Sequence, residues 1–240
     1  MISRSECKYI QSLSNKKQRD AEGLFVVEGP KLARELLNSN YTINKIVALS
    51  SWIDNNKTTA ATTMVTEDEL QKISNLQTAN EVLMLVKMPV ERPIQSFNNK
   101  LTIALDGIQD PGNFGTMIRI ADWFGIKQII CSNDCVELYN PKVIQSTMGS
   151  FMRVNINYTD LQNCLEIAAV PVFGALLNGN DVKNVAKPTE GILVIGNESK
   201  GIRENIMPCI SNAVSIKKIG GAESLNAAVA MGILLSHLTQ

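Results

Sequence analysis

Short apolar segments alternate with helical segments through the second half of the chain, and this pattern constrains the fold more than any other feature. Strands are predicted at 101–106, 127–131, 171–175, 191–195 and 213–216. Helices are predicted at 114–124, 140–148, 160–168, 203–208 and 224–238. Apolar strands separated by helices indicate an α/β fold with a mainly parallel sheet covered on both faces. In such sheets, ligands bind beyond the carboxyl ends of the strands.

The first half reads as a smaller α/β module with a less regular pattern. Helices are predicted at 4–14, 29–38 and 67–75, and strands at 24–28, 43–49 and 81–87. Two prolines and a charge cluster interrupt any regular period within 86–100. The predicted organisation is therefore a domain at 1–88, a linker at 89–99 and a second domain at 100–240.

Composition argues against several classes of protein. The 240 residues are 45% apolar and 19% charged, and no run approaches the ~18 apolar residues of a membrane span. The five cysteines form no CxxC pair, which indicates reduced thiols in a cytoplasm. A single histidine, His237, argues against a histidine-based zinc site and a Ser-His-Asp triad. We expect a cytoplasmic protein without a metal site or a membrane segment.

The charge balance, 23 basic against 23 acidic residues, gives no general attraction to nucleic acid. One local cluster, formed by Lys16, Lys17 and Arg19, lies in the segment NKKQRD. A loop or helix end that contacts phosphates has this composition, and so has a solvated basic turn. Charge alone leaves both interpretations open.

Three glycine-bearing loops, DGIQDPGNFG, IGNESKGI and IKKIGGAESLN, follow predicted strands and should converge at one edge of the sheet. In the first loop, Asn113 is placed to cap the following helix. Arg119 lies opposite the apolar face of that helix and points away from the core. A capped helix with an exposed arginine explains this loop equally well when it is taken alone. A nicotinamide site is disfavoured because G-x-G-x-x-G is absent.

The second and third loops add polar side chains at the same edge. Glu198 could orient an arginine or accept a hydroxyl proton, and a solvated turn is the alternative. In the third loop, Ser224 is predicted to cap the last helix, and Asn226 lies in its first turn. The helix carries an apolar stripe typical of a core or a subunit interface, formed by Leu225, Ala228, Val229, Gly232 and Leu235. No single loop establishes a site.

Taken together and in this order, DPGNFGTMIRIADWFG, IGNESKG and GAESLNAAVAMG resemble the three motifs of the SpoU (TrmH) family of RNA ribose 2′-O-methyltransferases, in the SPOUT superfamily. NPKVIQSTMGSFMRV resembles the family's connecting segment, and KKQRDAEGLFVVEGPKLARELL its N-terminal RNA-binding extension. The resemblance implies a deep trefoil knot, S-adenosylmethionine as cofactor and a homodimer. The extension favours ribosomal RNA as substrate. A tRNA 2′-O-methyltransferase and a non-catalytic RNA-binding protein are the alternatives.

The resemblance also assigns individual residues. The catalytic candidates, which match invariant polar positions of the family, are Asn113, Arg119, Glu198, Ser224 and Asn226. The candidates for the cofactor pocket are Gly196, Ile216, Leu225 and Leu176, and those for RNA contacts are Lys16, Lys17, Arg19 and Arg153. In the family account the arginine removes the proton from the ribose hydroxyl. Because a guanidinium normally stays charged, Arg119 could instead hold the adjacent phosphate and stabilise the developing alkoxide.

The sequence departs from the family pattern in three places. Ile216-Lys217-Lys218 stands where the family commonly has Ile-Pro-Met, so the cofactor loop lacks a stiffening proline and gains two candidate phosphate contacts. Alanines in AESLNAAVA replace a valine-serine pattern, and LQTANEVLMLV departs from a Thr-Pro-Gln-Gly turn. None of these changes removes a candidate polar residue.

Overall fold

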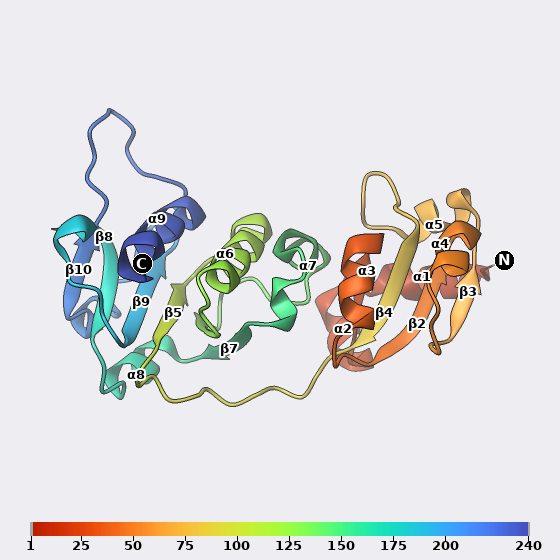
Figure 1. Cartoon of the computed structure of the whole chain (residues 1–240), viewed down its shortest axis with the longest axis horizontal. Coiled ribbons are helices and arrows are strands. Elements are labelled where there is room, and N and C mark those ends of the chain that lie inside the picture. Colours follow the sequence, from red (N-terminus) through yellow and green to blue (C-terminus); the bar gives the residue numbers. More distant parts are fainter. Residues whose placement is uncertain (1, 240) are drawn as a thin grey trace. The chain divides into compact units, whose positions relative to one another are not determined.

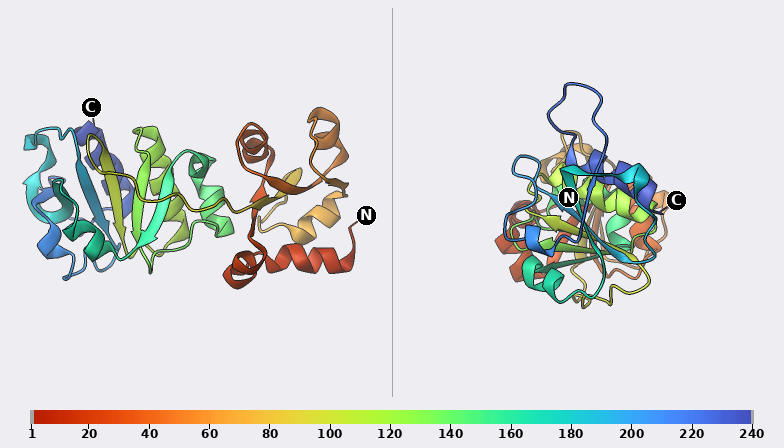
Figure 2. Two further views of the ribbon diagram at one scale, coloured as in Figure 1. Left: turned by 90° about the horizontal axis from the view of Figure 1, so that it is seen from below. Right: turned by 90° about the vertical axis from the view of Figure 1, so that its left-hand side faces the viewer.

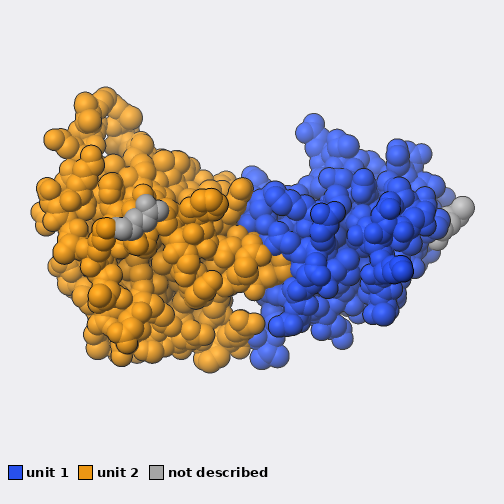
Figure 3. Space-filling view, viewed as in Figure 1, with its two compact units in different colours: residues 1–90, 139–149 blue, residues 91–138, 150–240 orange. Residues whose placement is uncertain are grey.

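The computed structural model describes residues 2–239, and the chain divides into two compact units (Figure 3). Unit 1 comprises the residues up to Val90 together with Tyr139–Gly149. Unit 2 comprises Glu91–Leu138 and the residues from Ser150 onward. Among the described residues, no helix combines the length and apolar character needed to cross a bilayer.

Unit 1 is built on a four-stranded sheet in the order β1-β4-β2-β3. Its strands are β1 (Leu24–Glu28), β2 (Ile43–Ala48), β3 (Thr62–Met64) and β4 (Val82–Lys87). β4 pairs antiparallel with β1 and β2, and β3 pairs parallel with β2. The helices are α1 (Arg4–Ser12), α2 (Lys16–Glu22), α3 (Pro30–Leu37), α4 (Ser50–Asn55), α5 (Glu67–Ile73) and α7 (Pro141–Thr147). Its apolar core includes Ile10, Leu13, Val26, Val47, Leu70 and Leu83.

Three elements of unit 1 were not predicted from the sequence. α2 reads KKQRDAE and has almost no apolar residue from which a helical period could be recognised. β3 spans only three residues, and α4 only six. The predicted turn before α3 is present, because Gly29 adopts φ +95° and Pro30 begins the helix.

Unit 2 is built on a six-stranded sheet in the order β10-β8-β9-β5-β6-β7. The strands are β5 (Leu101–Asp106), β6 (Gln128–Ser132), β7 (Asn155–Thr159), β8 (Val172–Asp181), β9 (Gly191–Gly196) and β10 (Asn212–Ser215). Every strand pair described in this sheet is parallel. This confirms the predicted α/β fold with a mainly parallel sheet. The trefoil knot stays a prediction from the family resemblance.

Helices cover both faces of this sheet. α6 (Pro111–Trp123) packs against α9 (Ala227–Thr239) on one face (Figure 1). α8 (Leu161–Glu166) covers the other face (Figure 2), where its apolar residues join a core with Ala104, Ile130 and Val194. The central strands β5 and β9 are buried almost throughout, as expected for strands enclosed between two helical layers.

Several predicted elements of unit 2 were wrong or missing. β7 was not predicted, because NINYT alternates polar and apolar residues without a continuous apolar run. The predicted helix 203–208 is absent; only a short 3₁₀ turn, Met207–Cys209, forms there. The last helix begins at Ala227 instead of 224, and two residues of its predicted stripe, Leu225 and Val229, are 49% and 51% exposed.

The segment at 91–99 is fastened to unit 2. The side chain of Gln128 accepts a hydrogen bond from Gln95 N at 2.7 Å and donates one to Gln95 O at 3.2 Å. Asn157 Nδ2 donates to Arg92 O at 2.6 Å. These hydrogen bonds hold the segment 91–99 against β6 and β7. Much of the predicted linker therefore belongs structurally to the second unit.

Candidate active site

The carboxyl ends of β5 and β9 lie side by side, with Asp106 opposite Gly196 in the parallel register. After β5 the chain turns into α6, whose first helical residue is Pro111. Asp110 caps this helix, because its Oδ1 accepts a hydrogen bond from Asn113 N at 2.7 Å. The prediction that the Asn113 side chain caps α6 was therefore wrong. That side chain is instead free to point across the sheet edge.

Asn113 connects the three predicted loops. Its Nδ2 donates to Glu198 Oε1 at 2.8 Å, and its Oδ1 accepts a hydrogen bond from Asn226 Nδ2 at 2.9 Å. Glu198 and Asn226 lie 85 and 113 residues farther along the chain. The structure thus brings three of the five catalytic candidates into one continuous chain of hydrogen bonds.

Asn226 also caps the last helix. Its Oδ1 accepts hydrogen bonds from the backbone N–H groups of Ala228 and Val229 at 3.0 and 3.2 Å. The predicted cap, Ser224, is exposed and lies outside the helix, so that assignment was wrong. Because one amide oxygen caps α9 while the amide nitrogen binds Asn113, the start of α9 is tied to the start of α6.

The loop after β9 owes its shape to Asn197 and two glycines. Asn197 Nδ2 donates to Gly107 O at 2.7 Å, and its Oδ1 accepts from the N–H groups of Ser199 and Lys200. The backbone of Gly201 closes the turn with two hydrogen bonds to Asn197. A Cβ at Gly196 would collide with the backbone of Gly201, so only glycine fits there. Gly196 therefore shapes the loop that presents Glu198.

An ion pair between Arg203 and the buried carboxylate of Asp106 anchors the end of that loop and was missed in the sequence. Asp106 is 1% exposed and accepts hydrogen bonds from Arg203 N at 2.8 Å and Arg203 Nε at 2.6 Å. Burial opposes the charge of Arg203, but the hydrogen bond and charge of Asp106 prevail, and the pKa of Arg203 is raised. The segment 203–208 also contains Pro208, which lacks the backbone N–H needed to continue a helix. In the sequence, the position of Asp106 at the end of an apolar strand was the one feature that could have indicated this ion pair.

Two side chains from the end of β6 fix the start of the first loop. Ser132 Oγ accepts a hydrogen bond from Gly107 N at 2.9 Å, and Cys135 Sγ accepts one from Ile108 N at 3.2 Å. Hydrogen bonding with Cys131 and Ser132 outweighs burial and lowers the pKa of Cys135 to about 7. Neither residue stood out in the sequence, because isolated serines and cysteines carry no pattern.

The other catalytic and cofactor candidates lie around this hydrogen-bonded chain. Arg119 is exposed on α6, and no described residue forms an ion pair with it. Ser224 and Leu225 are exposed in the loop 216–226, which extends away from the body of unit 2 (Figure 1). Ile216 and Leu176 are half-buried on the adjacent chain segments of β10 and β8. The described hydrogen bonds join none of these five residues to Asn113.

The loop 216–226 fits a ligand held by backbone groups. Within the described chain, the N–H groups of 217–225 donate to no protein acceptor. Residues 217–225 are exposed, so these N–H groups are open to water or to a ligand. S-adenosylmethionine has an adenine edge and an amino-acid end that such groups can bind. The described residues contain no group of three or more His, Cys, Asp or Glu side chains suited to a metal ion.

The basic candidates for RNA contacts differ in exposure. Lys16 is 63% exposed and pairs with Asp20 at 2.6 Å, and Lys17 is exposed. Arg153 is 46% exposed and pairs with Asp122 at 2.8 Å.

Arg19 does not fit the predicted phosphate contact. It is 1% exposed, and its Nη1 donates to the carbonyl oxygens of Leu13 and Ser14 at 2.8 and 2.7 Å. Burial lowers the pKa of its guanidinium. The prediction was wrong for this residue, because α2 turns Arg19 inward while Lys16 and Lys17 face solvent.

Comparisons with known proteins agree with this architecture. The model of the SpoU rRNA Methylase family matches residues 100–236, and the model of the MRM3-like substrate binding domain matches residues 4–84. Over 95% of its length, the chain is 28% identical to the 23S rRNA (guanosine(2553)-2′-O)-methyltransferase RlmP of Bacillus subtilis, of which it covers 93%.

Two solved structures resemble the chain over 99% of its length. One is described as an RNA methyltransferase of the TrmH family from Porphyromonas gingivalis, with a TM-score of 0.89, 33% identity and 98% of that chain covered. The other is an AdoMet-bound rRNA methyltransferase from Sinorhizobium meliloti, with a TM-score of 0.86, 26% identity and 96% coverage. The chain belongs to the SpoU rRNA methylase family, whose members are S-adenosylmethionine-dependent RNA ribose 2′-O-methyltransferases.

Proposed function

We propose that the protein methylates the ribose 2′-hydroxyl of one nucleotide in 23S ribosomal RNA, at the site formed by its three loops. The observation that carries this proposal is the hydrogen-bonded chain Glu198–Asn113–Asn226, which joins all three loops at the carboxyl edge of the sheet. The relative from Bacillus subtilis that matches nearly the whole chain is a 23S rRNA enzyme, which supports this RNA over tRNA.

The cofactor, when bound, supplies an electrophilic methyl group on a sulfonium. Methyl transfer is an in-line displacement, so the protein contributes mainly positioning and removal of the hydroxyl proton. We assign Gly196, Ile216 and Leu225 to cofactor binding through backbone groups, with Leu176 as an apolar wall. Ser224, which precedes Leu225 in the same loop, is proposed as a polar residue of the catalytic site.

Arg119 is assigned to the reacting ribose. Its guanidinium is exposed and has no ion-pair partner among the described residues, so it is available to a phosphate or a developing alkoxide. Asn113 begins the same helix and is held by Glu198 and Asn226. This tether fixes the helix that carries Arg119.

Mapping of 2′-O-methylated nucleotides in total RNA, from cells with and without the gene, tests the proposed function. Loss of methylation at one 23S rRNA nucleotide is the expected result. Loss at a tRNA position would show the tRNA alternative to be right. An unchanged map would favour a non-catalytic RNA-binding protein.

Binding of S-adenosylmethionine is expected to protect the loop 216–226 from trypsin. Lys217 and Lys218 are exposed in a loop without backbone pairing, so the free protein should be cut there readily. If only the free protein is cut, a cofactor concentration 100 times its Kd slows cleavage about 100-fold. Mass spectrometry of the fragments measures the rate, and cleavage after Lys57, which is exposed in a loop of unit 1 and followed by Thr58, is the internal control. Equal rates with and without cofactor would exclude this loop from cofactor binding.

We also propose that the enzyme is a homodimer, through the surface formed by α6 and α9. These helices pack together and expose large apolar side chains, with Trp123 84% and Val229 51% exposed. Trp123→Glu is expected to convert the dimer to a monomer of 26.3 kDa, measured by light scattering during gel filtration. Trp52→Phe, a change of a buried tryptophan in unit 1, should leave the mass unchanged. A monomeric wild-type protein would contradict the proposal.

The first unit is proposed to bind RNA through Lys16 and Lys17, and Arg153 is proposed to contact RNA from the second unit. The exposed side chains of all three support this. We place the enzyme in the cytoplasm, which is consistent with five free thiols.

A further inference from the structure

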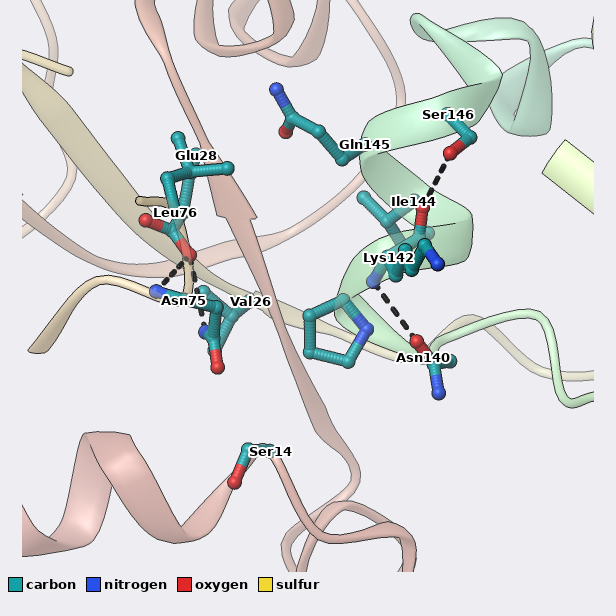
Figure 4. Close-up of a pocket in the computed structure, with 11 residues that line it drawn as sticks. Ser14, Val26, Glu28, Asn75, Leu76, Asn140, Lys142, Ile144, Gln145 and Ser146 are labelled. Carbon is teal, nitrogen blue, oxygen red and sulfur yellow. Dashed lines mark hydrogen bonds between the residues drawn. The ribbon is translucent and has the colours of Figure 1, made fainter. Parts of the chain in front are cut away.

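A pocket of about 380 Å³ lies within unit 1, between β1 and α7 (Figure 4). Its apolar walls are Val26, Leu76, Pro141 and Ile144. Its polar lining includes amide side chains on both sides, Asn75 on one and Asn140 and Gln145 on the other. Pockets with apolar walls and a few fixed polar groups are the usual form of a binding site for a small organic group.

On the β1 side, a buried carboxylate fixes one of these amides. Glu28 is 6% exposed and accepts hydrogen bonds from Asn75 N at 2.9 Å, from Asn75 Nδ2 at 3.1 Å and from the Ser74 hydroxyl. One N–H of Asn75 Nδ2 is thereby used, while no described residue donates to Asn75 Oδ1. The β1 side of the pocket thus offers a positioned acceptor, and the Glu28 carboxylate is already satisfied by protein donors.

On the α7 side, the amide of Gln145 extends from the helix toward Glu28 (Figure 4). No described residue forms a hydrogen bond with this amide, although the residue is half-buried. Asn140 Oδ1 accepts a hydrogen bond from Lys142 N at 2.9 Å, which leaves Asn140 Nδ2 to donate elsewhere. This side therefore offers both donors and an acceptor, and the Lys142 ammonium is exposed at the rim.

This lining selects for a neutral, flat and polar-edged group. A buried phosphate or carboxylate is disfavoured, because Glu28 is the buried charged group of the lining and would repel it. A nucleobase has apolar faces and an edge that alternates donors with acceptors, and asparagine and glutamine amides pair with such edges. Proteins that read RNA sequence do so mostly on unpaired bases whose edges are accessible.

We propose that this pocket receives one unpaired nucleobase of the substrate RNA, with the following phosphate near Lys142. The pocket would then be a recognition site apart from the residues assigned to methyl transfer. The proposal rests on the proposed function in one respect only, namely that the ligand of this protein is RNA.

The test is the affinity of the full chain for an unmodified 23S rRNA transcript, measured without cofactor. Gln145→Leu preserves the size of the side chain and removes its hydrogen bonds. We expect Kd for RNA to rise about tenfold, in line with loss of one amide–base pairing, and KM for RNA to rise with it. The affinity for S-adenosylmethionine and kcat should stay at wild-type values. Gln145→Glu, which brings a second carboxylate near Glu28, should weaken RNA binding further.

Gln162→Leu is the matched control, because Gln162 is also a half-buried helical glutamine but lies on α8 in unit 2. Retained cofactor affinity and melting temperature show that the variants are folded. Wild-type RNA affinity in both folded Gln145 variants would overturn the pocket proposal while methylation stays intact. If the wild-type protein binds the transcript but methylates no RNA, the proposed function fails and the pocket test still gives its answer.

Discussion

Arg119→Ala is expected to lower kcat for RNA methylation at least about 1,000-fold, the upper range for loss of one donor that stabilises a developing oxyanion. Binding of S-adenosylmethionine should be nearly unchanged, because the cofactor candidates lie in the other two loops and on β8. Stability should change by no more than about 0.5 kcal/mol, since the Arg119 side chain is exposed and has no ion-pair partner among the described residues. Transfer of a radiolabelled methyl group to 23S rRNA measures the rate, and calorimetry measures cofactor affinity.

The variant Arg119→Lys tests whether a positive charge at this position is sufficient or whether the planar guanidinium is required. Lysine retains the positive charge but lacks the planar fork that binds two oxygens at once. We expect methylation to be lost here too, because both a phosphate and the 2′-oxygen must be held. Arg4→Ala, at an exposed arginine of α1, should leave the rate unchanged. Undiminished turnover in either Arg119 variant would remove Arg119 from the mechanism.

Arg203→Ala is expected to destabilise unit 2 by about 3 kcal/mol, the lower end of the range for breaking a buried ion pair, because the Arg203 side chain is itself 41% exposed. The variant leaves the Asp106 carboxylate buried without its partner. The loop 197–203 also loses its anchor to β5, so Glu198 should be held less firmly against Asn113. Urea denaturation measures the stability, and the methylation assay should show a lower kcat.

Arg203→Lys and Lys200→Ala serve as comparisons. Lysine at 203 retains the charge but not the side-chain hydrogen bond from Nε, so an intermediate loss of stability is expected. Lys200 is exposed in the same loop and donates only its backbone N–H to Asn197, so alanine there should be neutral. A wild-type urea midpoint for Arg203→Ala would show that the ion pair contributes nothing to stability.

The parallel sheet could be predicted because its strands carry continuous apolar runs. β5 at Leu101–Asp106 coincides with its predicted bounds, and β9 extends its predicted bounds by a single residue. β7 was missed, because its polar residues at the edge of the sheet, such as Asn157, bind the connecting segment instead of packing in a core. The prediction failed where tertiary hydrogen bonds, and not apolar periodicity, determine the conformation.

The candidate site, too, could be predicted only where local sequence pattern, and not tertiary hydrogen bonding, determines the structure. The residue types of Asn113, Glu198 and Asn226 were visible in the motifs, and the topology of parallel strands placed their loops at one edge. Which amide caps which helix depends on contacts between residues far apart in sequence, so both capping predictions failed. The partners of Arg19 and Arg203 were likewise invisible, since the sequence shows a charge but not whether a helix or loop turns it inward.

The spacing of the hydrogen-bonded residues has a consequence for synthesis of the enzyme. β5 pairs with β6 nearby in sequence, but its other neighbour, β9, begins 90 residues after the first residue of β5. Contacts of such high sequence separation form slowly and late. In the polypeptide emerging from a ribosome, Asn113 gains its first partner from another loop when Glu198 has been translated, and its second only when Asn226 follows. The hydrogen-bonded chain Glu198–Asn113–Asn226 is therefore completed only when nearly the whole polypeptide has been synthesised.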